Sequence, residues 1–295
     1  MKLPMTGGLP LLCAHRGFNA VAPENTLPAF AAAVMAGAGE IELDLWPTAD
    51  GEIVVCHDPT VDRTTDGKGA IGALTYGEIA KLDAGIPFSP VWKGTRIPLF
   101  EEVLDRFANR TVMNIHIKSL GKRKNVSEAM LRRGKELLRL YPGGGTVALK
   151  DNMQRLIIPE EKAWEDDGNL PVYDPGVFRR IAGLVGKYGC RDAVYFTGEK
   201  DVLITAERIA PDIARCCLEG HMNYTIVENA LRYRCSRVQF CKTCLTRDMI
   251  AQAHASGLLC NLFWSDDTEE TRRFFDEGID VILTNATGTV KAAGA

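Results

Sequence analysis

Two histidines flank a pair of closely spaced carboxylates near the start of the chain. Glu42 and Asp44 are separated by one residue, with His15 before them and His57 after them. An imidazole titrates near neutral pH and can either accept or donate a proton. Two carboxylates held close together favour a divalent cation, because the cation offsets their mutual repulsion. The combination is suited to acid–base chemistry beside a metal-held phosphate.

The two carboxylates belong to a run, residues 40–45, that predicts a β-strand. Successive side chains of a strand point to opposite faces, so Glu42 and Asp44 point together to one face. The other face carries the apolar residues Ile41, Leu43 and Leu45. Because these require burial, the acidic face is not expected to be an ordinary solvated surface.

The strand is predicted to turn back through a hairpin that brings His57 to the carboxylates. Asp50-Gly51 is a strong turn signal before the β-rich run 52–56. A two-residue turn at Asp50 and Gly51 places His57 opposite Asp44. Pro47 would remove one hydrogen bond of that ladder, and a bulge there would shift the pairing by one residue. Either register keeps His57 near Asp44.

Eight strand-like runs alternate with helix-like runs, which is typical of a parallel sheet closed into a barrel. The predicted strands are 11–14, 40–45, 111–118, 193–197, 213–218, 237–241, 258–263 and 281–284. The predicted helices are 27–36, 99–108, 127–140, 177–188, 201–209, 224–233, 247–256 and 269–278. The sequence therefore predicts an α/β fold, a single TIM (β/α)8 barrel domain over residues 1–295. A small insertion (59–97) follows the second strand, and a loop insertion (141–176), either a lid or a surface loop, follows the third.

On the third barrel strand, three polar side chains alternate with apolar ones. Asn114, His116 and Lys118 are therefore expected to face the barrel axis. The apolar residues Met113, Ile115 and Ile117 are expected to face the outer helices. In such barrels the functional groups lie at the carboxyl ends of the strands.

The chain resembles the glycerophosphodiester phosphodiesterase family in several stretches that occur in the family's order. They are His15-Arg16-Gly17, Pro23-Glu24-Asn25-Thr26, Glu42-x-Asp44, Asp50-Gly51, His57-Asp58, Asp62 to Asp66 and Phe263-Trp264. The likeness covers most of the chain. It implies a TIM barrel and a metal-dependent hydrolysis of glycerophosphodiesters to sn-glycerol 3-phosphate and an alcohol.

Four cationic or titratable residues are candidates for the chemistry itself. His15 and His57 are the candidate general acid and base. Arg16 offers a planar fork for the non-bridging phosphate oxygens, and Lys118 offers a second positive charge. The alternative for Arg16 and Lys118 is an ordinary ion pair on the surface.

The resemblance implies one divalent ion, magnesium or calcium, held by Glu42 and Asp44. Family members usually carry a Glu-x-Lys pair on the third strand, where this chain has His116 and Lys118. An imidazole removes one negative charge and replaces oxygen with nitrogen, which favours manganese or zinc. Two alternatives remain open: the ion is held by Glu42, Asp44 and water alone, or His116 contacts phosphate instead of the ion.

Three further positions carry weaker signals. Trp264 is expected either to stack against the alcohol part of the substrate or simply to pack at a strand end. Glu24 is expected either to orient a ligand or to stabilise the start of the following helix through its dipole. Asn285 stands in a segment where the family usually has Thr-Asp-x-Pro, a departure expected to affect only the local turn.

Composition limits the classes of partner. With 35 basic and 38 acidic residues the net charge is −3, so no general attraction to nucleic acid or anionic membranes is expected. No apolar run approaches the roughly 18 residues of a membrane-spanning helix. The first residues also lack a signal-peptide apolar region, so a cytoplasmic location is expected. The predicted partner is a small glycerophosphodiester, and the oligomeric state is left open.

The chain has nine cysteines, several of them in apolar strand-like runs where thiols behave as small hydrophobes. Cys241-Lys-Thr-Cys244 has a spacing found in redox and metal sites. There is no second such pair, so core packing is the favoured interpretation and a redox or metal role is the alternative.

Two other activities compete with hydrolysis. One is a phospholipase D-type or lyase reaction that stops at a cyclic phosphate on a larger lipid. The other is a non-catalytic phosphodiester-binding protein, which the change at His116 makes worth testing.

Overall fold

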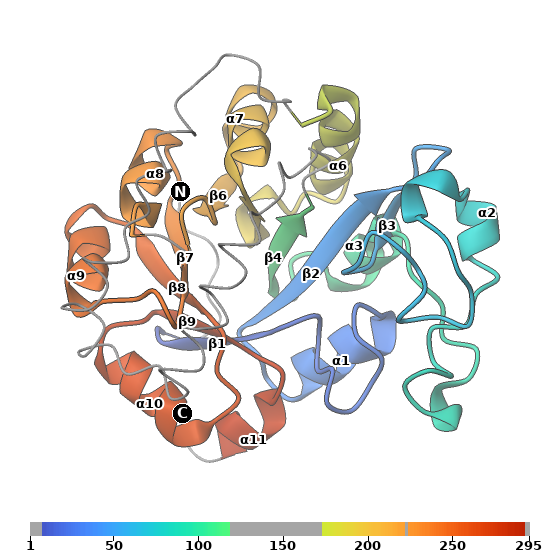
Figure 1. Cartoon of the computed structure of the whole chain (residues 1–295), viewed down its shortest axis with the longest axis horizontal. Helices are drawn as coiled ribbons and strands as arrows, with labels where there is room; N and C mark the ends of the chain where they lie inside the picture. The colour runs from blue at the N-terminus through green and yellow to red at the C-terminus, as the bar shows by residue number, and fades with distance from the viewer. Residues whose placement is uncertain (1–7, 119–172, 222–223, 293–295) are drawn as a thin grey trace, which may run out of the picture.

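A closed barrel of parallel strands forms the centre of the computed structural model, which describes residues 8–118, 173–221 and 224–292. Within these ranges eight parallel strands form the ring, and β1 closes it by pairing with both β2 and β9 (Figure 1). The strands are β1 (Leu11–Ala14), β2 (Glu40–Pro47), β4 (Val112–Ile117), β5 (Val194–Gly198), β6 (Ala214–Cys217), β7 (Arg237–Cys241), β8 (Leu259–Phe263) and β9 (Val281–Thr284). The predicted (β/α)8 barrel is confirmed.

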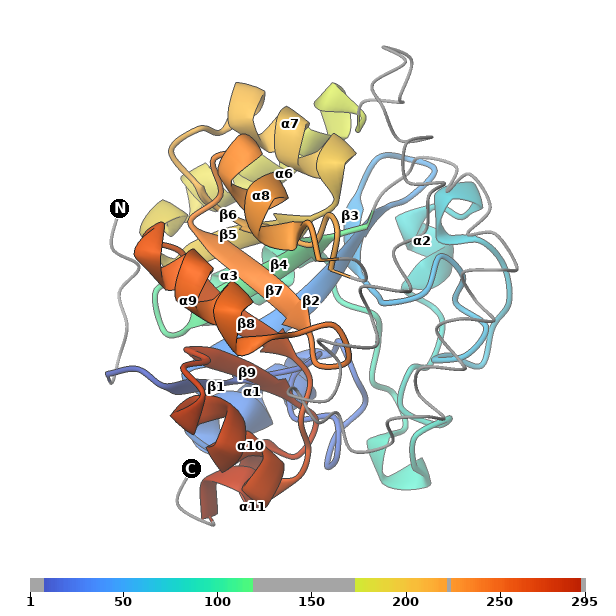
Figure 2. The same cartoon turned by 60° about the vertical axis from the view of Figure 1, so that its left-hand side comes forward.

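Helices surround the strands, and Figure 2 shows α8 and α9 on the outside of β7 and β8. The helices are α1 (Leu27–Met35), α3 (Phe100–Phe107), α6 (Pro175–Lys187), α7 (Lys200–Ile209), α8 (Ile226–Arg232), α9 (Arg247–Ala255), α10 (Thr268–Asp276) and α11 (Thr287–Ala292). The predicted helix 127–140 and nearly all of the predicted insertion 141–176 lie outside the described residues. None of the helices in the described ranges is long and apolar enough to cross a membrane.

The first helix begins where its capping residues dictate. Thr26 has an extended backbone, and its hydroxyl oxygen accepts a hydrogen bond from the Ala29 N–H at 3.5 Å. Pro28 lies in the first turn, where its missing N–H costs nothing. The loop between β1 and α1, which carries His15 to Asn25, is therefore anchored at its end.

The antiparallel strand β3 (Ile53–Val55) folds back on the carboxyl end of β2, as predicted. Its register corresponds to the shifted alternative, because Leu45 pairs with Val55 rather than with Cys56. The Thr48 N–H donates to the Glu52 carbonyl at 2.9 Å, which closes a three-residue turn. Gly51 ends that turn with a φ of +78°, a conformation that glycine adopts without strain.

The shift changes which residue faces Asp44. The Cys56 N–H donates to the Asp44 carbonyl at 3.0 Å, so Cys56 and not His57 lies directly opposite. The prediction from a two-residue turn was wrong in this detail, because the turn contains one more residue. His57 follows immediately and leaves the ladder toward the mouth of the barrel.

Alternation along β4 follows the predicted pattern. Met113, Ile115 and Ile117 are buried in the apolar cluster that includes α3 and α6. Asn114 points inward, and its amide donates to Gln239 Oε1 on β7 at 3.2 Å. The polar positions of β4 therefore line the barrel axis.

Residues 59–97 pack beside β3 around a small apolar cluster that they share with β3 and Cys56. Its members are Val54, Cys56, Val61, Ile71, Ile79, Ala84 and Ile97. The segment contains the short helix α2 (Tyr76–Ile79) and the 3₁₀ turns η1 (Ile71–Ala73) and η2 (Pro90–Trp92). Gly85 lets the chain pass η2, because a Cβ there would overlap the Trp92 carbonyl.

An ion pair between Glu40 and Arg237 is sealed inside the barrel. Glu40 Oε1 lies 3.0 Å from Arg237 Nη1, and both side chains are fully buried. The Tyr195 hydroxyl donates to the other carboxylate oxygen at 2.6 Å. The guanidinium also lies 4.2 Å from the centre of the Tyr195 ring. Each charge therefore has its main compensation within this cluster.

Replacing Glu40 with alanine should destabilise the barrel. The change leaves the Arg237 charge buried without its counterion, which costs about 3–5 kcal/mol. Urea unfolding followed by circular dichroism measures the loss. The double variant Glu40→Leu/Arg237→Met, which removes both charges, should recover most of it. Equal stability of Glu40→Ala and the wild type would contradict this account.

Candidate active site

The predicted site residues other than Trp264 converge at the mouth of the barrel from four neighbouring segments. Glu42 and Asp44 come from β2, His116 from β4, and His57 follows β3. His15 and Arg16 follow β1, and Lys118 follows β4. Because parallel strands end at one edge of the barrel, residues far apart in the sequence meet there.

Glu42 and Asp44 point to the same side of β2 and are buried, with 3% and 0% of their surface exposed. Glu42 Oε2 accepts a hydrogen bond from the Arg16 N–H at 2.9 Å. Asp44 Oδ2 accepts one from the Asn25 amide at 2.8 Å. Burial, reinforced by the charge of Asp44, raises the pKa of Glu42. The two carboxylates thus repel one another, a repulsion that a bound divalent cation would offset.

Lys118 and His116 face the carboxylates from β4. Lys118 Nζ lies 2.8 Å from Asp44 Oδ1, and His116 Nδ1 lies 3.3 Å from the same oxygen and 4.0 Å from Glu42 Oε1. Burial alone would raise the pKa of Asp44, but the nearby Lys118 ammonium and the His116 ring hold it well below its usual value. Lys118 therefore supplies positive charge at the pair.

Glu42, Asp44 and His116 are close enough together to fit a divalent cation. One ligand atom each from Glu42, Asp44 and His116 lies within 4.8 Å of the others. Asp44 Oδ1 is buried and receives no well-aligned hydrogen bond despite its close neighbours. Two carboxylates and one imidazole form a mixed oxygen and nitrogen donor set.

His15 is held by an asparagine from the opposite end of the chain. Its Nδ1 lies 2.9 Å from Asn285 Oδ1, and the Asn285 amide nitrogen donates to Asp266 Oδ2 at 2.8 Å. A carboxylate only accepts, so this bond fixes the amide with its oxygen toward His15. Nδ1 then carries the proton, and Nε2 is left to accept one. Burial, with the charge of Arg16, lowers the pKa of His15 to about 4.

The contact with Asn285 corrects the expectation that this departure from the family pattern concerns only the local turn. The side chain touches a candidate catalytic imidazole directly. Sequence spacing gave no signal of this contact, because His15 and Asn285 meet only when β9 closes the barrel against β1.

His57 is held in a similar way by its sequence neighbour. Its Nδ1 lies 2.6 Å from Asp58 Oδ1, so Nδ1 donates and Nε2 remains available. The Trp46 indole donates to the His57 carbonyl at 3.1 Å and fixes the backbone. Burial lowers the pKa of His57, whereas the charges of Asp44 and Asp58 act in the opposite direction.

Arg63 is an unpredicted link between the loops that carry the site. Its guanidinium donates to both oxygens of Glu24, at 2.9 and 2.7 Å, and to Asp58 Oδ2 at 2.6 Å. Glu24 in turn accepts from Arg16 Nη1 at 3.0 Å. Hydrogen bonds from Arg63 are the main cause that lowers the pKa of Asp58 to about 2. One side chain thus holds the partners of both Arg16 and His57.

Trp264 lies at the end of β8 and is 38% exposed. Lys242 Nζ lies 5.3 Å from its ring centre, and the Phe263 ring centre lies at 4.9 Å. The ring therefore lies beside two neighbours and is still accessible. Its proposed contact with substrate stays a prediction.

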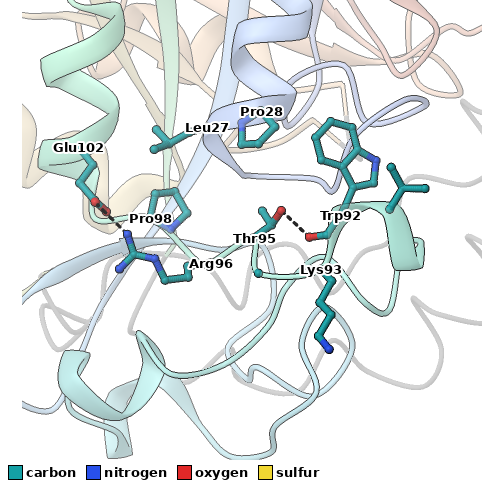
Figure 3. Close-up of a pocket in the computed structure, with 10 residues that line it drawn as sticks. Leu27, Pro28, Trp92, Lys93, Thr95, Arg96, Pro98 and Glu102 are labelled. Carbon is teal, nitrogen blue, oxygen red and sulfur yellow. Dashed lines mark hydrogen bonds and ion pairs between the residues drawn. The ribbon is translucent and has the colours of Figure 1, made fainter.

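A hollow of about 360 Å³ lies between the start of α1 and the segment that leads to α3 (Figure 3). Pro28 and Trp92 lie near each other on one side of it in this view, and Arg96 lies 3.7 Å from Glu102 on the other side. None of the predicted site residues lines this hollow.

Comparison with known proteins places the site in a family context. The profile of the Glycerophosphoryl diester phosphodiesterase family matches residues 15–165, just over half of the 295-residue chain. A glycerophosphodiester phosphodiesterase of Caldanaerobacter subterraneus subsp. tengcongensis is 49% identical over 110 residues, 37% of this chain and 45% of that protein. One from Bacillus subtilis is 41% identical over 117 residues, 37% of this chain and 40% of that protein. The chain thus matches less than half the length of these curated relatives.

Solved structures share the whole barrel at lower identity. A glycerophosphodiester phosphodiesterase from Agrobacterium tumefaciens aligns with a TM-score of 0.70 and 22% identity, over 96% of this chain and 100% of that chain. An Oleispira antarctica phosphodiesterase in complex with the product sn-glycerol-3-phosphate aligns with a TM-score of 0.69 and 21% identity, over 97% and 96%. At this identity the likeness establishes the fold alone. Because the family profile covers just over half of the chain, including the paired carboxylates, His15 and His57, the chain belongs to the glycerophosphoryl diester phosphodiesterase family.

Proposed function

We propose that this protein hydrolyses glycerophosphodiesters to sn-glycerol 3-phosphate and an alcohol. One observation carries the proposal: two imidazoles, each fixed through Nδ1, accompany a buried carboxylate pair at the mouth of the barrel. The named relatives act in the same class of reaction, and the Oleispira antarctica structure contains sn-glycerol-3-phosphate as product.

Glu42, Asp44 and His116 would hold one divalent ion beside the phosphate. When bound, the ion supplies positive charge to the phosphoryl oxygens as negative charge develops on them. Arg16 is prepared for the same phosphate, because Glu24 holds one side of its guanidinium at 3.0 Å. Lys118 adds a second cation at the carboxylates.

The two histidines divide the proton transfers. One accepts the proton of the neighbouring glycerol hydroxyl as that hydroxyl attacks phosphorus, and the other gives a proton to the leaving alcohol. Water then opens the resulting cyclic phosphate, with the two roles reversed. Both rings are fixed through Nδ1, so Nε2 is the reacting atom of His15 and of His57.

Turnover of glycerophosphocholine tests this function. The purified protein with added divalent ion should release sn-glycerol 3-phosphate, detected by phosphorus NMR, and a chelator should abolish the signal. His15→Ala and His57→Ala should each reduce the rate by roughly 10²–10⁴ while still folding. A cyclic phosphate as the end product would instead support the lyase alternative. Absence of turnover with every ion would support the non-catalytic alternative.

The identity of the residue at position 116 should set the preference for metal. His116→Glu restores a negative charge and an oxygen ligand, so affinity for calcium should rise relative to zinc. Isothermal titration of each ion into the protein measures this directly, with Asp44→Asn as the variant expected to lose binding. If the ratio of calcium affinity to zinc affinity is the same in His116→Glu as in the wild type, His116 lies outside the metal site.

Arg63 should act as a positioning residue. Arg63→Met removes the bonds that hold Asp58 and Glu24, so kcat/KM should fall about 10- to 100-fold, by analogy with the loss known for groups that orient metal ligands. Arg191→Met is a matched control, because Arg191 makes an exposed pair with Asp212 at 2.7 Å. It should leave activity unchanged. The thermal midpoints of both variants should stay close to that of the wild type, and a loss of activity that follows a loss of stability would refute the positioning role.

A further inference from the structure

Cys241 and Cys244 lie together where β7 ends at the mouth of the barrel. All nine cysteines belong to the described ranges and are present as thiols, and of these Cys241 alone is partly exposed. Cys244 is 2% exposed. The sequence favoured core packing for this pair, but the exposure of Cys241 separates it from the other cysteines.

The backbone between the two cysteines has the geometry of a tight turn. The Cys244 N–H donates to the Cys241 carbonyl at 2.9 Å. Such a turn brings its first and last α-carbons within about 7 Å, close to the roughly 4.4–6.8 Å that a disulfide requires. The two thiols are hydrogen-bonded to each other, and Thr243 Oγ1 lies 3.1 Å from Cys241 Sγ. A disulfide between them needs little movement of the chain.

The two thiols are chemically unequal. The hydrogen bond from Cys244, helped by Thr243, lowers the pKa of Cys241 well below that of an ordinary thiol. The same hydrogen bond and burial raise the pKa of Cys244. An accessible, acidic thiol beside a buried one is the arrangement in which the first attacks and the second resolves the mixed disulfide.

We propose that Cys241 and Cys244 form a dithiol site that exchanges with small-molecule disulfides and closes an intramolecular disulfide beside the candidate active site. The Cys241 thiolate attacks one sulfur of the small disulfide, whose S–S bond breaks and releases one thiolate. Cys244 then loses its proton and attacks the Cys241 sulfur, which releases the second. The two protein protons end on the two released thiols, so one small disulfide is reduced for each protein disulfide formed.

The cysteine pair lies next to Trp264, a residue predicted to contact the substrate. Lys242, between the two cysteines, donates to Glu270 Oε2 at 3.0 Å and lies over the Trp264 ring. Closing the disulfide restricts the turn that holds Lys242. The inference concerns a modification site and does not depend on the proposed phosphodiesterase activity.

Trypsin offers a direct test, because it cuts after Arg237, Lys242 and Arg247 and separates the two cysteines. The reduced full chain is incubated with oxidised glutathione, quenched by alkylation, and digested without reductant. The expected product in mass spectrometry is peptide 238–242 joined to peptide 243–247 through one disulfide. The other seven cysteines should be alkylated only.

Two variants complete the test. Cys244→Ser should stop the reaction at the mixed disulfide and accumulate glutathione on Cys241. Cys241→Ser should form neither the joined peptides nor the mixed disulfide with glutathione. The proposal is overturned if the folded wild type yields no joined peptides, or if glutathione attaches to the buried cysteines as readily as to Cys241.

Discussion

Repulsion between acidic side chains on one face of β2 is the constraint around which the barrel is organised. Glu40, Glu42 and Asp44 all point inward, because side chains two residues apart share a face of a strand. Burying three carboxylates in one column is unfavourable unless each is compensated. The compensation differs between Glu40, the lower carboxylate inside the barrel, and Glu42 and Asp44, the upper pair at its mouth.

The lower carboxylate is compensated by the protein itself. Glu40 has the buried guanidinium of Arg237 at 3.0 Å and a hydroxyl donor from Tyr195. Of the upper pair, Glu42 accepts a hydrogen bond from the Arg16 backbone N–H, and Asp44 accepts one from the Asn25 amide. The Lys118 ammonium lies beside Asp44. No described guanidinium lies as close to either upper carboxylate, since Arg16 Nε is 3.8 Å from Asp44. The two carboxylates at the mouth thus lack a close guanidinium partner such as Glu40 has, and burial with the charge of Asp44 raises the pKa of Glu42.

The sequence revealed the parts of this arrangement that depend on local periodicity. Alternation was enough to place Glu42 with Asp44 and His116 with Lys118, and strand counting was enough for the barrel. The hairpin register was missed by one residue, because turn length depends on Thr48 and Glu52, whose contact carries no local signal. Arg63 and Asn285 were missed as site residues for a different reason. The contacts of Arg63 with Glu24 and of Asn285 with His15 join segments that are distant in the sequence, and only closure of the fold brings these together.

The partners of the two histidines make their rings unequal in a way that bears on the proposed reaction. His57 donates to a carboxylate, Asp58, and an anion at that position stabilises an imidazolium. His15 donates to the neutral amide of Asn285, which offers no comparable charge, and Arg16 lies nearby. The family pattern has an aspartate where this chain has Asn285, so the neutral partner of His15 follows from the sequence of this chain. Of the two rings, His57 therefore holds an added proton more readily, whereas His15, whose pKa burial and Arg16 lower to about 4, stays neutral near pH 7 and keeps Nε2 free to accept a proton.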